Sequence, residues 1–138
     1  MNTELTLPEI EAIASVLLIE DDVDVAYLLG FMLQHEGLAV RTLTNGRDAS
    51  DFIAESSPSD IIVMDLMLPY VDGFELITQV RENTFWHDVP IIVLSGKSAE
   101  RDIVRAFELG ADDYITKPFQ PKELIVRVWQ FARLTGRK

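Results

Sequence analysis

The stretch DIIVMDLMLP, residues 60–69, contains four consecutive apolar residues, an aspartate, Asp65, and then further apolar residues. A short, unbroken run rich in Ile and Val is typical of a strand covered on both faces of a parallel sheet. Asp65 therefore stands at the carboxyl end of a predicted buried strand, and no residue from 61 to 69 can pair with it. Burying an unpaired carboxylate is costly, so we expect Asp65 to be paired, protonated or bound to a cation.

Four further stretches are short, apolar and bounded by turn residues, which makes them candidate strands. They are residues 16–20 (VLLIE), 38–43 (LAVRTL), 90–95 (PIIVLS) and 112–117 (DDYITK). Segments with helical periodicity lie between the strands and have recognisable ends. Two are predicted to begin after caps at Asp22 and Asn45 and to end at Gly37 and before Pro58. The third contains Leu76, Ile77 and Val80. The fourth is predicted to run from a Ser98 cap through Ile103, Val104 and Phe107 to Gly110. The fifth is predicted to begin at Pro121, with Leu124, Val128 and Ala132 on one stripe.

The order of these segments predicts an α/β fold. Five strands that alternate with helices imply a parallel sheet with right-handed crossovers and helices on both faces. The chain has 138 residues, which is the size of one domain. Residues 1–15 show no sustained period, and we expect them to be an N-terminal extension.

The composition excludes several classes of function. The formal net charge of -11 disfavours direct binding to nucleic acid or to an anionic membrane surface. The absence of cysteine excludes disulfides, thiolate metal sites and cysteine nucleophiles, and suits a reducing compartment. The sequence contains neither an apolar run long enough to span a membrane nor the features of a signal peptide. We therefore expect a cytoplasmic protein.

Polar residues stand at the carboxyl ends of four predicted strands. In an open α/β sheet, ligands bind at this edge, where the strand order reverses. The residues concerned are Glu20 and Asp21, Asp65, Ser95, and Lys117. The other four side chains in this group are the polar neighbours that Asp65 lacks within its own segment.

Gathering these carboxylates has an electrostatic cost. Two carboxylates about 4 Å apart repel by about 4 kcal/mol at an effective dielectric of 20, so stability alone does not explain Asp21 beside Asp65. A hard divalent cation such as Mg²⁺ resolves the conflict, and Lys117 adds a positive charge outside the metal shell. A phosphoryl group fits the same site, with Asp65 as the nucleophile that attacks phosphorus and Ser95 as a hydroxyl donor.

Four motifs, in order, resemble the receiver domain of two-component response regulators, and the resemblance covers residues 16–134. They are VLLIEDD (16–22), DIIVMDLMLPYVDG (60–73), IIVLSG (91–96) and GADDYITKPF (110–119). Each motif alone is weak, but all four at this spacing are specific. The resemblance makes residues 135–138 a C-terminal tail or a truncated linker.

The resemblance implies a flavodoxin-like (βα)5 fold and a role in signalling rather than as an enzyme. A histidine kinase or phosphotransfer protein would donate a phosphoryl group to Asp65, and the domain would assist its own phosphorylation and dephosphorylation. Mg²⁺ would be held by Asp21, Asp65 and the backbone carbonyl of Met67, with Glu20 acting mostly through water. Ser95 and Tyr114 would be the switch residues, and a cis Lys117–Pro118 bond would aim Lys117 into the site.

The resemblance also implies how the state of Asp65 is read out. The surface formed by the fourth predicted helix, the fifth strand and the last helix would switch to bind a partner or a second copy. The C-terminal part is most similar to the OmpR/PhoB-type subfamily, in which Asp113 and Arg127 would pair between subunits. The sequence ends at RLTGRK, so two alternatives stay open: a receiver that acts alone, or one separated from an output domain at a linker.

Three other functions compete with this interpretation. A flavin- or nucleotide-binding protein of the same fold needs a Gly-, Ser- or Thr-rich phosphate cradle after the first strand, where this chain has EDDVD. A haloacid dehalogenase-type hydrolase needs a second Asp two residues after the nucleophile, where this chain has Met67. The third is a phosphorylation-independent, receiver-like interaction module, which predicts that a site residue is missing. The resemblance also implies that Met67 and Lys97 occupy the two positions that tune self-dephosphorylation. Because the Met67 side chain cannot orient an attacking water, we expect a long-lived phosphoryl state.

Overall fold

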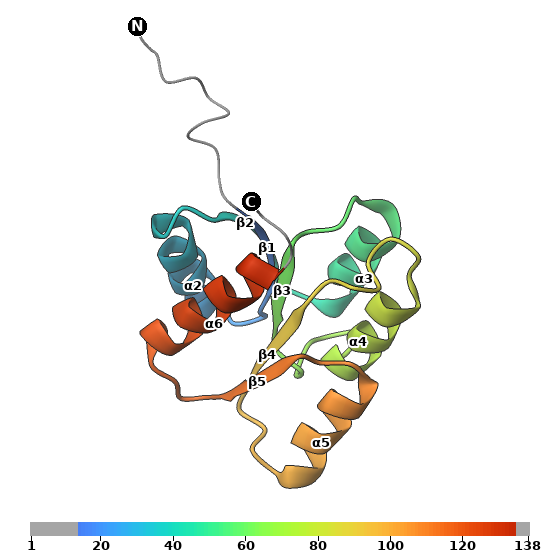
Figure 1. The fold of residues 1–138 in the computed structure, drawn as a ribbon. Coiled ribbons are helices and arrows are strands. Elements are labelled where there is room, and N and C mark those ends of the chain that lie inside the picture. Colours follow the sequence, from blue (N-terminus) through green and yellow to red (C-terminus); the bar gives the residue numbers. More distant parts are fainter. Residues whose placement is uncertain (1–13, 135–138) are drawn as a thin grey trace, which may run out of the picture.

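The computed structural model describes residues 14–134 and shows a five-stranded parallel sheet between two layers of helices (Figure 1). The elements follow one another as β1 (Ser15–Ile19), α2 (Val23–His35), β2 (Ala39–Leu43), α3 (Gly46–Glu55), β3 (Ile61–Met64), α4 (Gly73–Glu82), β4 (Ile91–Ser95), α5 (Glu100–Leu109), β5 (Asp113–Thr116) and α6 (Pro121–Leu134). The predicted α/β fold is confirmed. Except for Ala14 and Ser15, the predicted N-terminal extension lies outside the described residues, as does the tail 135–138.

The sheet has the strand order β2-β1-β3-β4-β5. Strand β2 is added on one side of β1 and strands β3 to β5 on the other, so the strand order reverses between β1 and β3. Residues of β1 alternate between the two faces, as the pleat of a strand requires. Val16 and Leu18 pack in the core beneath α2 and α6, and Leu17 and Ile19 pack in the core beneath α3 and α4. The central strand β3 is buried along its whole length, which explains its unbroken apolar sequence.

Most predicted helix ends are confirmed by capping contacts. The Asp22 carboxylate accepts hydrogen bonds from the backbone N–H groups of Asp24 and Val25, and Asn45 accepts one from Asp48. Gly37, just after α2, has a φ of 93°, a value that favours glycine. The predicted buried stripe on α6, formed by Leu124, Val128 and Ala132, is confirmed. The Asp22 cap fixes the start of α2 directly after the end of β1, which carries Glu20 and Asp21.

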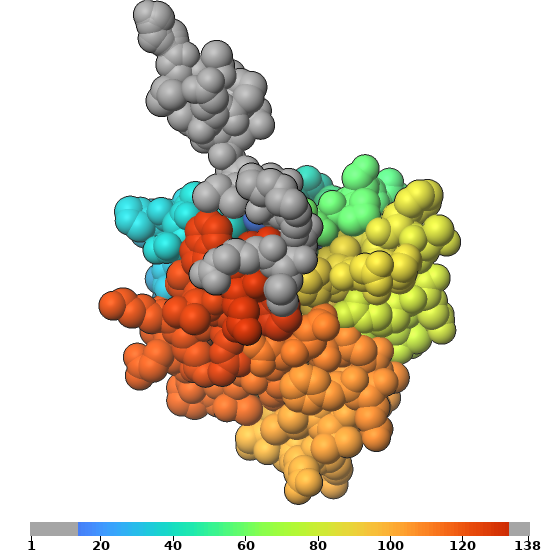
Figure 2. Space-filling view, viewed as in Figure 1, coloured from blue at the N-terminus to red at the C-terminus, as the bar shows by residue number. Residues whose placement is uncertain are grey.

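The predicted start of α5 was wrong. The helix begins at Glu100, its N-cap is Ala99, and no side chain caps it. Ala106 is its one buried residue, whereas Val104 and Phe107 are each 44% exposed. In the space-filling view α5 forms the orange projection at the lower edge of the molecule (Figure 2). A helical apolar period shows which residues share a face, but not whether a neighbour covers that face.

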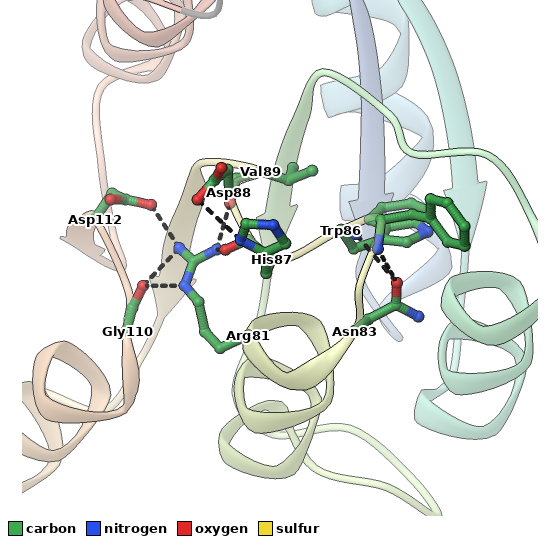
Figure 3. Close-up of polar contacts among 9 residues, drawn as sticks. Arg81, Asn83, Trp86, His87, Asp88, Val89, Gly110 and Asp112 are labelled. Atoms are coloured by element: carbon green, nitrogen blue, oxygen red, sulfur yellow. Dashed lines mark hydrogen bonds and ion pairs between the residues drawn. The ribbon is translucent and has the colours of Figure 1, made fainter.

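Arg81, in the last turn of α4, holds the opposite edge of the sheet together (Figure 3). Its guanidinium donates to the carbonyl oxygens of His87, Val89 and Gly110 at distances between 2.6 and 3.0 Å. It also lies 2.8 Å from Asp112, whose carboxylate accepts a hydrogen bond from the backbone of Ile91. We call Arg81, these three carbonyls and Asp112 the Arg81 cluster. It joins α4 to the amino ends of β4 and β5.

Two further features concern residues that the sequence singled out. The Lys117–Pro118 peptide bond is cis, as predicted. Asp113 pairs with Arg127 inside the same chain, with Oδ1 and Nη1 2.6 Å apart. The two residues predicted to pair between subunits thus pair within one chain.

No helix in the described part, residues 14–134, is long and apolar enough to cross a membrane.

Candidate functional site

Asp65 lies directly after β3, at the carboxyl edge of the sheet, and is 6% exposed. Its backbone N–H donates to the carbonyl of Ile19 in β1, which fixes the residue beside the end of that strand. Its Oδ1 accepts a hydrogen bond from the backbone N–H of Met67 at 3.1 Å. Its Oδ2 lies 3.0 Å from the Nζ of Lys117. The aspartate that had no partner in its own segment is therefore paired with a lysine 52 residues away.

Lys117 is shared with a second buried carboxylate. Its Nζ lies 2.9 Å from Oε1 of Glu20, a residue that is 2% exposed, and Oε2 of Glu20 accepts from the backbone N–H of Asp22. Burial raises the pKa of Glu20 above its ordinary value of 4.5, although its hydrogen bonds with Lys117 and Asp22 act in the opposite direction. Burial alone would lower the pKa of Lys117, but hydrogen bonds with Glu20 and Asp65 outweigh it and raise that pKa above 10.5.

Asp21 completes an acidic cluster. Carboxylate oxygens of Glu20, Asp21 and Asp65 all lie within 4.8 Å of one another. Asp21 is exposed to solvent, while the other two are buried. One lysine thus stands among three carboxyl groups, so the formal charges of these side chains do not balance. We call these four residues the Asp65 cluster; its oxygen donors are of the kind that Mg²⁺ prefers.

Ser95 and Tyr114 meet at the loop that follows β4. Ser95 is fully buried, and its Oγ accepts a hydrogen bond from the backbone N–H of Lys97 at 3.2 Å. The hydroxyl of Tyr114 donates to the carbonyl of the same Lys97 at 2.7 Å. Burial is the main cause that raises the pKa of Tyr114 above 10.0. The two predicted switch residues therefore bind one backbone segment from two strands.

Met67 occupies a different kind of position from the other predicted residues. Its side chain is largely exposed, at 57%, and its backbone N–H contacts Asp65. A role for its carbonyl as a metal ligand stays a prediction.

Two glycines hold the loop after Asp65: Gly73 ends the motif at residues 60–73, whereas nothing in the residue pattern singled out Gly46. A Cβ on Gly46 would lie 1.7 Å from the carbonyl oxygen of Val71. A Cβ on Gly73, the first residue of α4, would lie 2.7 Å from the carbonyl oxygen of Asp65. Each position requires glycine because the backbones approach too closely for a side chain.

Comparison with known proteins agrees with this arrangement. The family described as the response regulator receiver domain matches residues 16–129. The receiver domain of Francisella response regulator 1452 is 31% identical, with a TM-score of 0.82, over 88% of this chain and 98% of that one. The receiver domain of a signal transduction histidine kinase from Syntrophus aciditrophicus is also 31% identical, with a TM-score of 0.82, over 91% and 94%.

A third similar structure contains a metal. It is the receiver domain of a Pseudomonas aeruginosa sensor histidine kinase, with magnesium coordinated in its active-site cleft. It is 28% identical, with a TM-score of 0.79, over 87% of this chain and 98% of that one. By its fold, the arrangement of its carboxyl-edge residues and the family match, the chain belongs to the response regulator receiver domains of two-component signalling.

Proposed function

We propose that Asp65 accepts a phosphoryl group from a phosphorylated histidine of a sensor kinase or phosphotransfer protein. The observation that carries the proposal is a buried Asp65 carboxylate that shares one lysine with Glu20 and lies next to Asp21. An oxygen of Asp65 attacks phosphorus, the phosphorus–nitrogen bond breaks, and the imidazole leaves with the electron pair. The acceptor is thus a carboxylate just past the end of the central strand, held by the backbone of Met67.

The same residues suit a divalent cation. Asp21, Asp65 and the backbone carbonyl of Met67 would hold Mg²⁺, and Glu20 would act mostly through water. Three carboxylates within 4.8 Å of one another and a single lysine form a donor set that calls for additional positive charge. When bound, the ion would neutralise charge on the phosphoryl oxygens. The magnesium in the related Pseudomonas receiver supports this assignment.

The remaining predicted residues would stabilise the product and transmit its formation. Lys117 would neutralise part of the phosphoryl charge, since its ammonium already lies 3.0 Å from Asp65. Ser95 would donate its hydroxyl to a phosphoryl oxygen. That change would alter the hydrogen bond that Lys97 now makes with Ser95 and, through the Lys97 carbonyl, the position of Tyr114. An added charge of about -1.5 to -2 would thereby bias the loop between β4 and α5.

The readout surface in this proposal consists of α5, β5 and α6. Val104 and Phe107 on α5 and Val126 on α6 are exposed apolar residues that a partner or a second copy would cover. If the chain belongs to the OmpR/PhoB-type subfamily, as its C-terminal motif led us to expect, the recipient would be a second copy in a homodimer or an output domain. Because Asp113 pairs with Arg127 inside the chain, that dimer would have to exchange this ion pair.

Further proposals follow from the same function. Residues 16–134 would form the receiver unit. The protein would act in the cytoplasm, where kinase and receiver meet. The domain would assist its own dephosphorylation, and Met67 would make that reaction slow because its side chain cannot orient water. The lifetime of the phosphoryl group on the wild type and on Met67→Asn tests the last point; equal lifetimes, or a longer one for the variant, would contradict it.

Transfer from a kinase tests the function itself. A panel of sensor kinases, autophosphorylated with labelled ATP, would be mixed with the chain, and transfer of label would be followed in time. We expect at least one kinase to label the wild type within minutes and Asp65→Asn not at all. Asp88→Asn, an exposed acid outside the Asp65 cluster, is the matched control and should be labelled normally. Labelling of Asp65→Asn at the wild-type rate would overturn the proposal.

A further inference from the structure

Tyr70 lies in the loop between β3 and α4 and has a backbone conformation that tyrosine rarely adopts. Its φ is 75°, and among residues 14–134 it is the one residue other than glycine with a positive φ. The N–H of Val71 donates to the carbonyl of Pro69 at 2.9 Å, so Tyr70 is the central residue of a γ-turn. A γ-turn with a positive φ at its centre is strained, and the strain persists only where neighbouring contacts hold it.

The side chain of Tyr70 makes one of these contacts. The guanidinium carbon of Arg47, in the first turn of α3, lies 4.1 Å from the centre of the Tyr70 ring. We call this cation–π contact the Arg47–Tyr70 stack. Glycine would adopt the same φ without strain, so a tyrosine here indicates that its ring contributes something that glycine cannot. The stack is that contribution, because it offsets part of the strain.

The same turn is joined to α3 through the backbone. The carbonyl of Pro69 accepts a second hydrogen bond, from the N–H of Gly46 at 3.0 Å, and Gly46 is the first residue of α3. Gly46 also approaches Val71 so closely that no side chain fits between them. Two adjacent residues of α3, Gly46 and Arg47, therefore hold the backbone and the side chain of one turn.

This turn lies on the segment that leads from Asp65 to α4. Met67 donates its N–H to Oδ1 of Asp65 at 3.1 Å, and Tyr70 follows Met67 by three residues. Residues 67–72 belong to no helix or strand, so the direction of the Met67 carbonyl depends on how the segment is held. Asp65 holds the segment before that carbonyl, and the turn against α3 holds it afterwards.

Building on the proposed function, we propose that Arg47 and Tyr70 are positioning residues for Mg²⁺. The Arg47–Tyr70 stack holds the strained turn, and the turn keeps the Met67 carbonyl in the orientation in which it can bind the ion. Without the stack, the strain is released and the segment takes up other conformations, so only a fraction of the molecules offers all the ligands at once. The apparent dissociation constant of Mg²⁺ rises by the inverse of that fraction.

The test is the dissociation constant of Mg²⁺, measured without any phosphodonor. The chain is titrated with MgCl₂ while the backbone amide NMR signals of Met67 and its neighbours are followed. We expect Arg47→Gln and Tyr70→Ala each to raise the constant about threefold, as for the loss of one exposed cation–π contact. Tyr70→Phe keeps a ring and should bind Mg²⁺ like the wild type. The double variant should bind no more weakly than either single variant, since the two residues act as one contact.

Arg41→Gln is the matched control. The guanidinium carbon of Arg41 lies 4.9 Å from the centre of the Phe52 ring, so this variant removes an equal charge and the same kind of contact outside the loop. It should leave the dissociation constant of Mg²⁺ unchanged. Removing a positive charge by itself favours a cation, so weaker binding in Arg47→Gln would not arise from net charge.

The outcomes separate this inference from the function on which it rests. Binding of Mg²⁺ to Arg47→Gln or Tyr70→Ala as tightly as to the wild type would overturn the role of the stack and leave the metal site in place. Equal weakening in Arg41→Gln would mean that a general loss of stability acts, and would overturn that role as well. If MgCl₂ shifted no amide signal near Asp65 in the wild type, the metal site of the proposed function would be contradicted instead.

Discussion

The Asp65 cluster and the Arg81 cluster lie at opposite edges of one sheet and differ in how their charges are matched. Arg81 donates to three carbonyls and to Asp112, so a single positive group is surrounded by acceptors at short distances. In the other cluster Lys117 contacts Glu20 and Asp65 and leaves Asp21 without a positive partner among the described residues. Matched charge is what stability requires, and unmatched charge is what a site for a cation and a phosphoryl group requires.

The largest expected effect is on the matched cluster. Arg81→Met would leave Asp112 without its positive partner and the carbonyl of Gly110 without its donor, so we expect the free energy of unfolding to fall by about 2–4 kcal/mol. Urea unfolding followed by tryptophan fluorescence measures this, because Trp86 is fully buried beside the segment. Arg101→Met, an exposed arginine, is the control. A loss below 0.5 kcal/mol in Arg81→Met, within the usual range of about ±0.5 kcal/mol for surface changes, would show that the cluster does not hold that edge.

In the Asp65 cluster we expect the opposite effect, a rise in the free energy of unfolding when a charged side chain is removed. In the absence of Mg²⁺, Asp65→Asn removes one of three neighbouring carboxylates while keeping the side chain's volume and an acceptor for Met67. We expect the free energy of unfolding to rise by about 1 kcal/mol. Glu108→Gln, which removes an exposed acid from α5, should change it little. A destabilised Asp65→Asn would mean that the cluster is balanced and that the contrast with Arg81 is wrong.

Mg²⁺ should supply the positive charge that the Asp65 cluster lacks and so make its charges more nearly matched, as those of the Arg81 cluster are. At a concentration about five times its dissociation constant, the ion should stabilise the wild type by about 1 kcal/mol. Asp21→Asn should lose this increment, and Asp24→Asn, an acid in the first turn of α2, should keep it. Thermal unfolding with and without Mg²⁺ gives both values. Equal stabilisation of the wild type and Asp21→Asn would place the ion elsewhere.

The smallest effect concerns the link between Tyr114 and Lys97. Burial raises the pKa of Tyr114 above 10.0, so the folded state holds this proton more tightly than the unfolded state does. Stability should therefore fall as the pH rises from 10.0 through the raised pKa, and the loss should be smaller in Tyr114→Phe. The difference in tyrosinate absorbance between wild type and Tyr114→Phe gives the pKa. A value at or below 10.0 would contradict the partly buried position of the Tyr114 side chain.

The Asp65 cluster was more predictable than the Arg81 cluster, for a physical reason. Parallel strands bring all their carboxyl ends to one edge, so Glu20, Asp65 and Lys117 could be grouped once the strands were recognised. Arg81 and Gly110 are 29 residues apart and belong to no periodic pattern, so nothing in the sequence relates them. A hydrogen bond to a carbonyl depends on backbone position rather than on residue type.

Helix α5 shows the other limit. Ser98 has the residue type of a cap, yet the helix begins two residues later without a capping side chain. Its apolar period was read correctly, but the exposure of Val104 and Phe107 depends on how few neighbours surround the helix. The pairing of Asp113 with Arg127 within one chain could not be predicted either, since identical side chains can pair within a subunit or between two.

The most direct test of the account is the intact mass of the chain after incubation with acetyl phosphate, with and without Mg²⁺. Asp65→Ala is measured beside the wild type, and Asp88→Asn serves as the control acid away from the site. We predict the addition of one phosphoryl group to the wild type and to Asp88→Asn, only when Mg²⁺ is present, and none to Asp65→Ala. Addition to Asp65→Ala, or no addition to the wild type with Mg²⁺, would contradict the assignment and favour a phosphorylation-independent binding module.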